Sequence, residues 1–316
     1  MAERRRRAGW KWGLSIAPVG LFLLAACGDG SPSQPDDPEP GAFPRDTVFA
    51  DVPTCPGGSP AALMDIRFPP SGVGDGAPMA LHLHGGAWVA GDKGDGPWYE
   101  EVASGLLARG FIVATASYRL APLHPWPAQI HDAKCAVRHL RANAARYWGD
   151  PDRIVVWGHS AGGHLSSMLG VTAPDAGFEG AGFSGVSSAV RGVVSVAGVS
   201  NLPPLSSNFL LAFALNATFG TSNPASPVLR DGSPITWVSP GDAPHLLVHG
   251  EQDPLIPLSQ ATALQDRLAA SSVRGELVRV VNGGHSLEPT GGSPSPDAAE
   301  TLQRILTFMS DVISSN

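Results

Sequence analysis

The sequence predicts a single α/β domain with a largely parallel sheet and helices on both faces. This class is predicted by apolar runs of strand length that alternate with segments of helical periodicity. The 316 residues suffice for one such domain of common enzyme size. Nothing repeats at a fixed period, so a solenoid or propeller is not expected.

Residues 1–26 are predicted to be an export signal. A basic start, Arg4 to Lys11, precedes a short apolar run that Pro18 interrupts. A membrane-spanning helix needs about 20 apolar residues, so we expect cleavage instead of a retained span. The junction Leu24-Ala25-Ala26-Cys27 resembles a bacterial lipobox, in which the cysteine becomes the lipidated first residue of the mature chain.

The lipobox resemblance implies an exported protein, periplasmic or at the cell surface, that Cys27 anchors to a membrane. An ordinary secretory peptide with a chance cysteine is the alternative. Residues 27–44 are rich in Gly, Ser, Pro, Asp and Glu, which predicts a flexible linker. The folded domain is then expected to span 45–316.

Composition restricts the partners. Charged residues make up 16%, and the net charge of −7 includes the basic N-terminus, so the folded part is more acidic still. This balance excludes nucleic acid and favours a small neutral ligand, while the oligomeric state stays open. Besides Cys27 the chain holds Cys55 and Cys135, which could form a disulfide or remain separate thiols, because sequence alone does not give their separation.

The elements of the domain follow from hydrophobic periodicity. Apolar residues recur at helical spacing from Pro127 to Leu140, over 260–270 and over 298–313, and each of these segments is expected to bury one stripe against the sheet. Residues 200–237 break the alternation, and their Pro and Ser content predicts a small cap insertion; a packed crossover helix is the alternative. The expected strands are 79–84, 111–117, 154–157, 190–196, 246–249 and 277–281.

The motif Gly158-His159-Ser160-Ala161-Gly162 lies between a predicted strand and a predicted helix. This is the context of a nucleophile elbow, a sharp turn that exposes the serine hydroxyl, and Ser160 is the predicted nucleophile. An activated serine needs a base and an orienting acid. His285 and Asp253 follow predicted strands downstream, in the chain order serine, acid, base.

Both assignments have competitors. Glu251 lies two positions before Asp253 and is the alternative acid. His159 and His164 lie too close to Ser160 along the chain to fold back onto it as a base, and the glycines before His285 leave its loop free.

The loop after the first predicted strand is expected to bind an oxyanion. Small residues in His84-Gly85-Gly86-Ala87-Trp88 let backbone N–H groups approach a substrate oxygen. Gly86, Ala87 and Ala161 are the predicted donors, and Gly85 is the predicted hinge. His82 and His84 share a strand face, but two ligands without a third do not predict a metal.

These motifs resemble the esterases related to hormone-sensitive lipase and the bacterial feruloyl-esterase-like group, which share the α/β-hydrolase fold. The resemblance covers about 45–312 and includes Gly91-Asp92-Lys93 and 117–122 (Ser-Tyr-Arg-Leu-Ala-Pro). It implies a Ser-His-Asp triad, water as co-substrate, carboxylic ester substrates and no cofactor. Ala87 stands where the lipase-like branch has a third glycine, which points to the feruloyl-esterase-like branch and leaves the acyl preference open.

Two other functions compete with an esterase. A serine peptidase of the prolyl-oligopeptidase type would need a propeller for which this chain has no room. A catalytically inactive surface-binding protein would keep the fold. Its acid, base, nucleophile and oxyanion loop would each be free to change to other residues, and here all four are present. The sequence therefore favours an ester hydrolase.

Overall fold

The computed structural model describes residues 46–315. The predicted export signal, Cys27 and the whole of the predicted linker lie outside the described residues. Within 46–315 no helix is both long enough and apolar enough to span a membrane.

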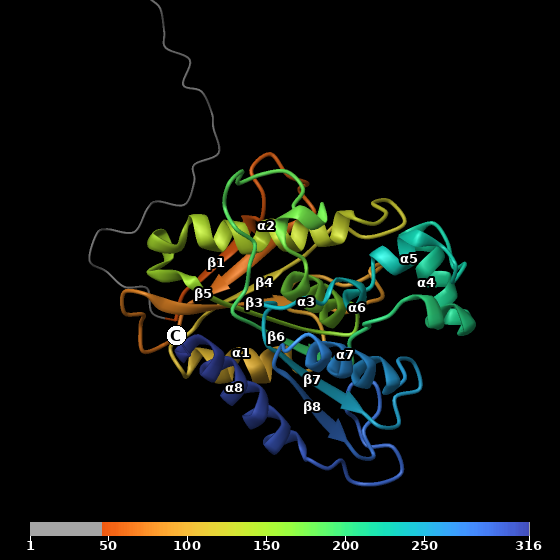
Figure 1. Ribbon diagram of the computed structural model, residues 1–316. Helices are drawn as coiled ribbons and strands as arrows, with labels where there is room; N and C mark the ends of the chain where they lie inside the picture. Colours follow the sequence, from red (N-terminus) through yellow and green to blue (C-terminus); the bar gives the residue numbers. More distant parts are fainter. Residues whose placement is uncertain (1–45, 316) are drawn as a thin grey trace, which may run out of the picture. The chain divides into compact units, whose positions relative to one another are not determined.

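An eight-stranded sheet in the order β1-β2-β4-β3-β5-β6-β7-β8 organises the domain (Figure 1). Adjacent strands from β4 to β8 in this order are parallel, whereas β1 pairs antiparallel with β2 and β2 pairs antiparallel with β4. The six predicted strands are confirmed, and the two antiparallel strands were not predicted. The strands are β1 (Val48–Pro53), β2 (Leu63–Arg67), β3 (Ala77–Leu83), β4 (Ile112–Ala116), β5 (Gly149–His159), β6 (Gly192–Val196), β7 (His245–Gly250) and β8 (Gly275–Val280).

Helices cover both faces of the sheet, as predicted (Figure 1). On one face, α2 (Ala128–Ala142), α3 (Ala161–Val171) and α7 (Ser259–Ala270) pack on the sheet. On the other face lie α1 (Tyr99–Leu107) and α8 (Ala298–Ser314). Central strands are buried on both faces, which is why they read as continuous apolar runs instead of alternating ones.

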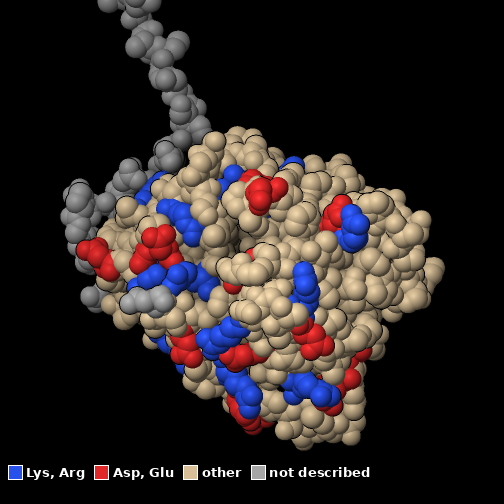
Figure 2. Space-filling model, in the orientation of Figure 1, with Lys and Arg blue, Asp and Glu red and all other residues tan. Residues whose placement is uncertain are grey.

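The segment predicted as a cap folds into short helices. These are the 3₁₀ helix Pro203–Ser207, α4 (Phe209–Phe219), α5 (Pro227–Asp231) and α6 (Pro234–Trp237). The Asn208 side chain caps α4 by accepting from the N–H groups of Leu210 and Leu211. One side of α4 is buried and Phe209 and Phe213 are exposed on the other, and α4 forms a charge-free part of the surface (Figure 2).

A disulfide joins Cys55, after β1, to Cys135 in the middle of α2, with Cα atoms 5.7 Å apart. The sequence left this pairing open. The bridge ties the antiparallel edge of the sheet to the helix that covers it.

Removing this disulfide is expected to destabilise the protein without changing the site. The bridge closes a loop with a sequence separation of 80. Loop-closure entropy alone would give about 4.5 kcal/mol of unfolding free energy, and disulfides typically contribute about 2 to 4 kcal/mol. The variant Cys55→Ser/Cys135→Ser should lose that amount in urea unfolding. Reduced wild-type protein is the control, and an unchanged unfolding midpoint in both would contradict the prediction.

Candidate active site

Ser160 occupies the turn between β5 and α3, with φ 55° and ψ −116°. Its backbone N–H donates to the carbonyl of Val196 at 2.9 Å. The turn is tight enough to need glycine on both sides, because a Cβ at Gly158 would lie 2.5 Å from the Leu83 carbonyl oxygen and a Cβ at Gly162 would overlap the same oxygen. The left-handed backbone of a non-glycine residue costs energy, and such strain is concentrated at functional sites.

His285 and Asp253 are brought together from loops after neighbouring strands, β8 and β7. The His285 Nδ1–H donates to Asp253 Oδ2 at 2.7 Å. Because a carboxylate only accepts, this bond places the ring proton on Nδ1 and leaves Nε2 as an acceptor. The other oxygen, Asp253 Oδ1, accepts from the N–H groups of Leu255 at 2.8 Å and Ile256 at 2.9 Å.

The Asp253 carboxylate is ionised despite complete burial of its side chain. Burial alone would raise its pKa, but the hydrogen bond and charge of His285 and the two backbone N–H groups outweigh it, so the pKa is lowered below 3.8. The alternative acid, Glu251, pairs instead with Arg279 at 2.9 Å. The structure therefore places Asp253, and not Glu251, against His285.

Sequence reasoning missed His249, at the end of β7. Its Nε2–H donates to the Ile256 carbonyl at 2.8 Å and lies 3.5 Å from Asp253 Oδ2. Burial lowers the pKa of His249, so the ring is a neutral donor. It packs behind the acid and fixes the loop that carries it. The only signal in the sequence was its position four residues before Asp253.

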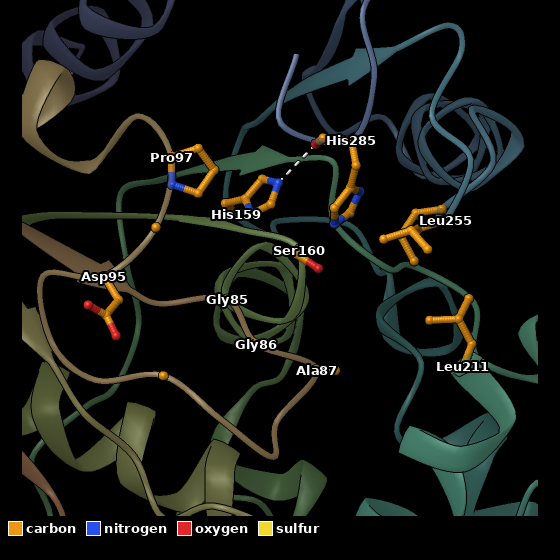
Figure 3. A pocket seen from close by; sticks show the side chains of 13 residues that line it. Gly85, Gly86, Ala87, Asp95, Pro97, His159, Ser160, Leu211, Leu255 and His285 are labelled. Carbon is orange, nitrogen blue, oxygen red and sulfur yellow. Dashed lines mark hydrogen bonds between the residues drawn. The ribbon is translucent and has the colours of Figure 1, made fainter. Parts of the chain in front are cut away.

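Ser160 and His285 line one cavity of about 420 Å³ (Figure 3), which is in the size range of small-molecule sites. Gly85, Gly86 and Ala87 line the same cavity. The contacts described for 46–315 include no hydrogen bond between the Ser160 hydroxyl and the His285 ring; such bonds often tighten only when substrate binds. The remaining wall includes Leu211 of α4, Leu255, Ile256, Asp95 and Pro97.

The loop after β3 turns through consecutive left-handed residues, with φ 105° at Gly86, 53° at Ala87 and 62° at Trp88. Among the described contacts, the N–H groups of Gly86 and Ala87 donate to no protein acceptor. Ala161 begins α3, and the first N–H of a helix has no partner within it. The three predicted donors are thus available to an oxygen, and a Cβ at Gly85 would lie 3.7 Å from the Ser160 Cβ.

Side-chain contacts hold this loop in place. The Trp88 indole N–H donates to His164 Nδ1 at 3.2 Å, and the opposite nitrogen of His164 donates to the Gly232 carbonyl at 2.7 Å. Burial lowers the pKa of His164 to about 4, which keeps its ring neutral and able to accept from Trp88. The Tyr118 hydroxyl donates to the His84 carbonyl at 2.9 Å.

His82 and His84 have structural partners. A His82 ring nitrogen lies 3.0 Å from the Thr115 hydroxyl, and burial lowers the pKa of His82 to about 3. The His84 Nδ1–H donates to the Gly85 carbonyl at 2.7 Å, and the ring stacks on Tyr118. Among residues 46–315 no cluster of three or more His, Cys, Asp or Glu could hold a metal ion.

Two solved structures that share this fold are named as esterases. The truncated form of a carbohydrate esterase from gut microbiota superposes with a TM-score of 0.74 at 24% identity, covering 86% of this chain and 98% of that one. Esterase 2 of Thermogutta terrifontis, phosphoramylated by tabun, has a TM-score of 0.67 at 22% identity, covering 87% of this chain and 97% of that one. The predicted α/β-hydrolase fold is confirmed.

Sequence relatives are also esterases. Esterase LipC of Mycobacterium tuberculosis is 32% identical over 256 residues, which is 79% of this chain and 63% of LipC. Esterase LipQ of the same organism is 32% identical over 72% of this chain and 55% of LipQ. The chain thus spans less than two thirds of the length of these curated relatives. The BD-FAE family model matches residues 64–268, and the chain therefore belongs to the BD-FAE family of α/β-hydrolase esterases.

Proposed function

We propose that this protein is a carboxylic ester hydrolase that forms an acyl-enzyme intermediate on Ser160. The observation that carries the proposal is the shared cavity of Ser160 and His285, with His285 held by Asp253 at 2.7 Å. That hydrogen bond keeps the ring proton on Nδ1 and leaves Nε2 unprotonated. The His285 ring and Ser160 line the same cavity, so Nε2 is available to accept the serine proton. Membership of an esterase family supports the same reaction.

In the first half of the reaction the Ser160 hydroxyl attacks the ester carbonyl carbon while His285 Nε2 takes its proton. The N–H groups of Gly86, Ala87 and Ala161 stabilise the negative oxygen of the tetrahedral intermediate, and Gly85 lets the loop approach. His285 then gives its proton to the leaving alcohol. In the second half, water attacks the acyl-enzyme through the same steps, and Asp253 stabilises the imidazolium that forms each time.

Small neutral esters are the proposed substrates. Leu211, Leu255 and Ile256 give the cavity an apolar wall, and the Asp95 carboxylate at its edge disfavours anionic acyl groups. The Thermogutta terrifontis esterase has been solved with propionate and with butyrate bound, and a cavity of about 420 Å³ has room for acyl groups of that size. No cofactor is needed for this chemistry.

Two experiments test the proposal: labelling of the protein with a fluorophosphonate, and rates of hydrolysis for a panel of esters. We expect one label per chain at Ser160 and hydrolysis of p-nitrophenyl acetate and butyrate; acetylated xylan and feruloyl esters then define the acyl and alcohol preference. A chain that neither labels nor cleaves any ester would be a binding protein. Cleavage of peptide bonds in preference to esters would identify a peptidase.

We also propose that the protein is exported and anchored to a membrane by lipid on Cys27. The support is the sequence alone: a basic start, a short apolar run and the lipobox-like junction Leu24-Ala25-Ala26-Cys27. An anchor with more than one acyl chain gives stable attachment. The site would then work outside the cytoplasm, in the periplasm or at the cell surface.

The variant Cys27→Ser is expected to leave membranes while its soluble activity stays within about twofold of wild type, because the linker separates the anchor from the domain. Fractionation of cells into membrane and soluble proteins measures the first effect and ester hydrolysis the second. Ala26→Ser, next to the modified position, is the matched control. Continued membrane association of Cys27→Ser would mean that the apolar segment is retained.

A further inference from the structure

We propose that His159 is a positioning residue that fixes His285, the base of the proposed function on which this inference rests. His159 precedes the nucleophile in the elbow, and its Nε2–H donates to the backbone carbonyl of His285 at 2.9 Å (Figure 3). The bond therefore links the residue next to the nucleophile with the residue that carries the base.

The His285 carbonyl takes its hydrogen bond from outside its own loop, from the ring of His159. Within residues 46–315 no other donor reaches that oxygen. The following carbonyl, Ser286, accepts from the Trp98 indole N–H at 3.0 Å. The loop that carries His285 is thus held at two successive carbonyls, by His159 from the elbow and by Trp98 from the start of α1.

The ring of His159 is confined as well as bonded. The residue is 7% exposed, and its ring centroid lies 4.7 Å from that of His285. A Cβ at Gly85 of the oxyanion loop would lie 3.4 Å from its Nδ1. A carbonyl only accepts, so Nε2 must carry the proton. His159 therefore lies between the base and the oxyanion loop and sets the distance between them.

Neutrality is part of the role. Burial lowers the pKa of His159 to about 4, although the hydrogen bond to the His285 carbonyl and the charges of Asp253 and Glu288 act to raise it. His285 becomes an imidazolium during each half of the proposed reaction, and a cation 4.7 Å away would oppose that protonation. A neutral imidazole supplies a donor without a charge, which lysine or arginine at this position would not.

Three variants test the assignment. His159→Leu fills similar space but removes the donor, whereas His159→Gln keeps a neutral N–H donor. His139→Leu removes a half-buried histidine of α2 that bonds to Tyr147, away from the site, and serves as the matched control. Measurements are kcat and KM for p-nitrophenyl acetate, the rate of fluorophosphonate labelling at Ser160, and thermal unfolding.

His159→Leu should let the His285 ring shift, and kcat should fall about a hundred-fold while KM stays within about threefold of wild type. A misplacement of roughly 1 Å in a catalytic group lowers the rate by about this factor. The labelling rate should fall in parallel. His159→Gln should recover to within about tenfold of wild type, and His139→Leu should lower only the unfolding temperature. If His159→Leu does not fold, His159→Met provides the same loss of a donor with a more adaptable side chain.

Wild-type kcat in a folded His159→Leu or His159→Met would overturn the inference, and so would equal losses in the leucine and glutamine variants. Failure of the proposed function looks different. If the proposed function were wrong, Ser160 of the wild-type chain would not react with the fluorophosphonate, or His285→Ala would remain active. Either result would be independent of the residue at position 159.

Discussion

Replacing Ser160 or His285 with alanine is expected to lower kcat by about a million-fold, and replacing both should cost no more than either alone. The hydroxyl and the imidazole act as one unit, so removing one member makes the other ineffective. The variants should still hydrolyse the ester about a thousand-fold faster than the uncatalysed reaction in water, because the backbone donors and substrate binding remain. Ester hydrolysis by the three variants, followed to low rates with purified protein, measures this.

Thermal unfolding of the same variants separates chemistry from folding. Ser160 has a positive φ, and alanine there meets the same backbone strain, so Ser160→Ala should unfold within a few degrees of wild type. Losses that are small and add in the double variant would mean that neither residue takes part in the reaction. Ser206→Ala, a serine of the cap segment, is a suitable control for substitution as such.

Asp253→Asn is expected to lower kcat by about ten-thousand-fold. An asparagine can present its amide N–H to the ring and so favour the tautomer with the proton on Nε2, where it cannot accept from Ser160. The loss should be smaller than that of the nucleophile because the geometry persists. Since the pKa of Asp253 lies below 3.8, the wild-type carboxylate stays ionised above that pH, and protonation at lower pH should reproduce part of the defect.

Glu251→Gln is the matched control, because Glu251 precedes Asp253 by two positions and pairs with Arg279 instead of His285. Its activity should stay within about threefold of wild type. If Glu251→Gln lost activity and Asp253→Asn kept it, the acid would be Glu251. Both proteins need the same unfolding measurement, since Asp253 also accepts two backbone N–H groups.

Most of the strands that the sequence predicted are buried on both faces, such as β3 and β6, because their apolar runs are uninterrupted. The edge strand β8 was predicted as well, although only Val278 and Val280 of it are buried. β1 was missed because Asp51 and Pro53 lower its strand propensity. β2 does alternate, with Met64 and Ile66 buried, but it is only five residues long. The polar first half of β5 was missed for the same reason as β1: Asp150 and Pro151 are weak strand formers.

The candidate site was predicted residue by residue, but its contacts were not. Motif context marked Ser160, Asp253 and His285, because an elbow has local requirements and loops after parallel strands share one edge of the sheet. The choice of Asp253 over Glu251, the Cys55–Cys135 disulfide and the bond from His159 to the His285 carbonyl all depend on tertiary distances. Sequence spacing does not determine such distances.

The strand order gives the two halves of the site unequal mechanical support. Ser160 follows β5, which is hydrogen-bonded on both sides, whereas His285 follows β8, a strand at one edge of the sheet that pairs with β7 alone among the described strands. Outer strands open more readily than central ones, and local opening needs less free energy than global unfolding. On warming we therefore expect the loop of His285 to open before the rest of the molecule unfolds, so that activity is lost below the unfolding temperature and returns on cooling.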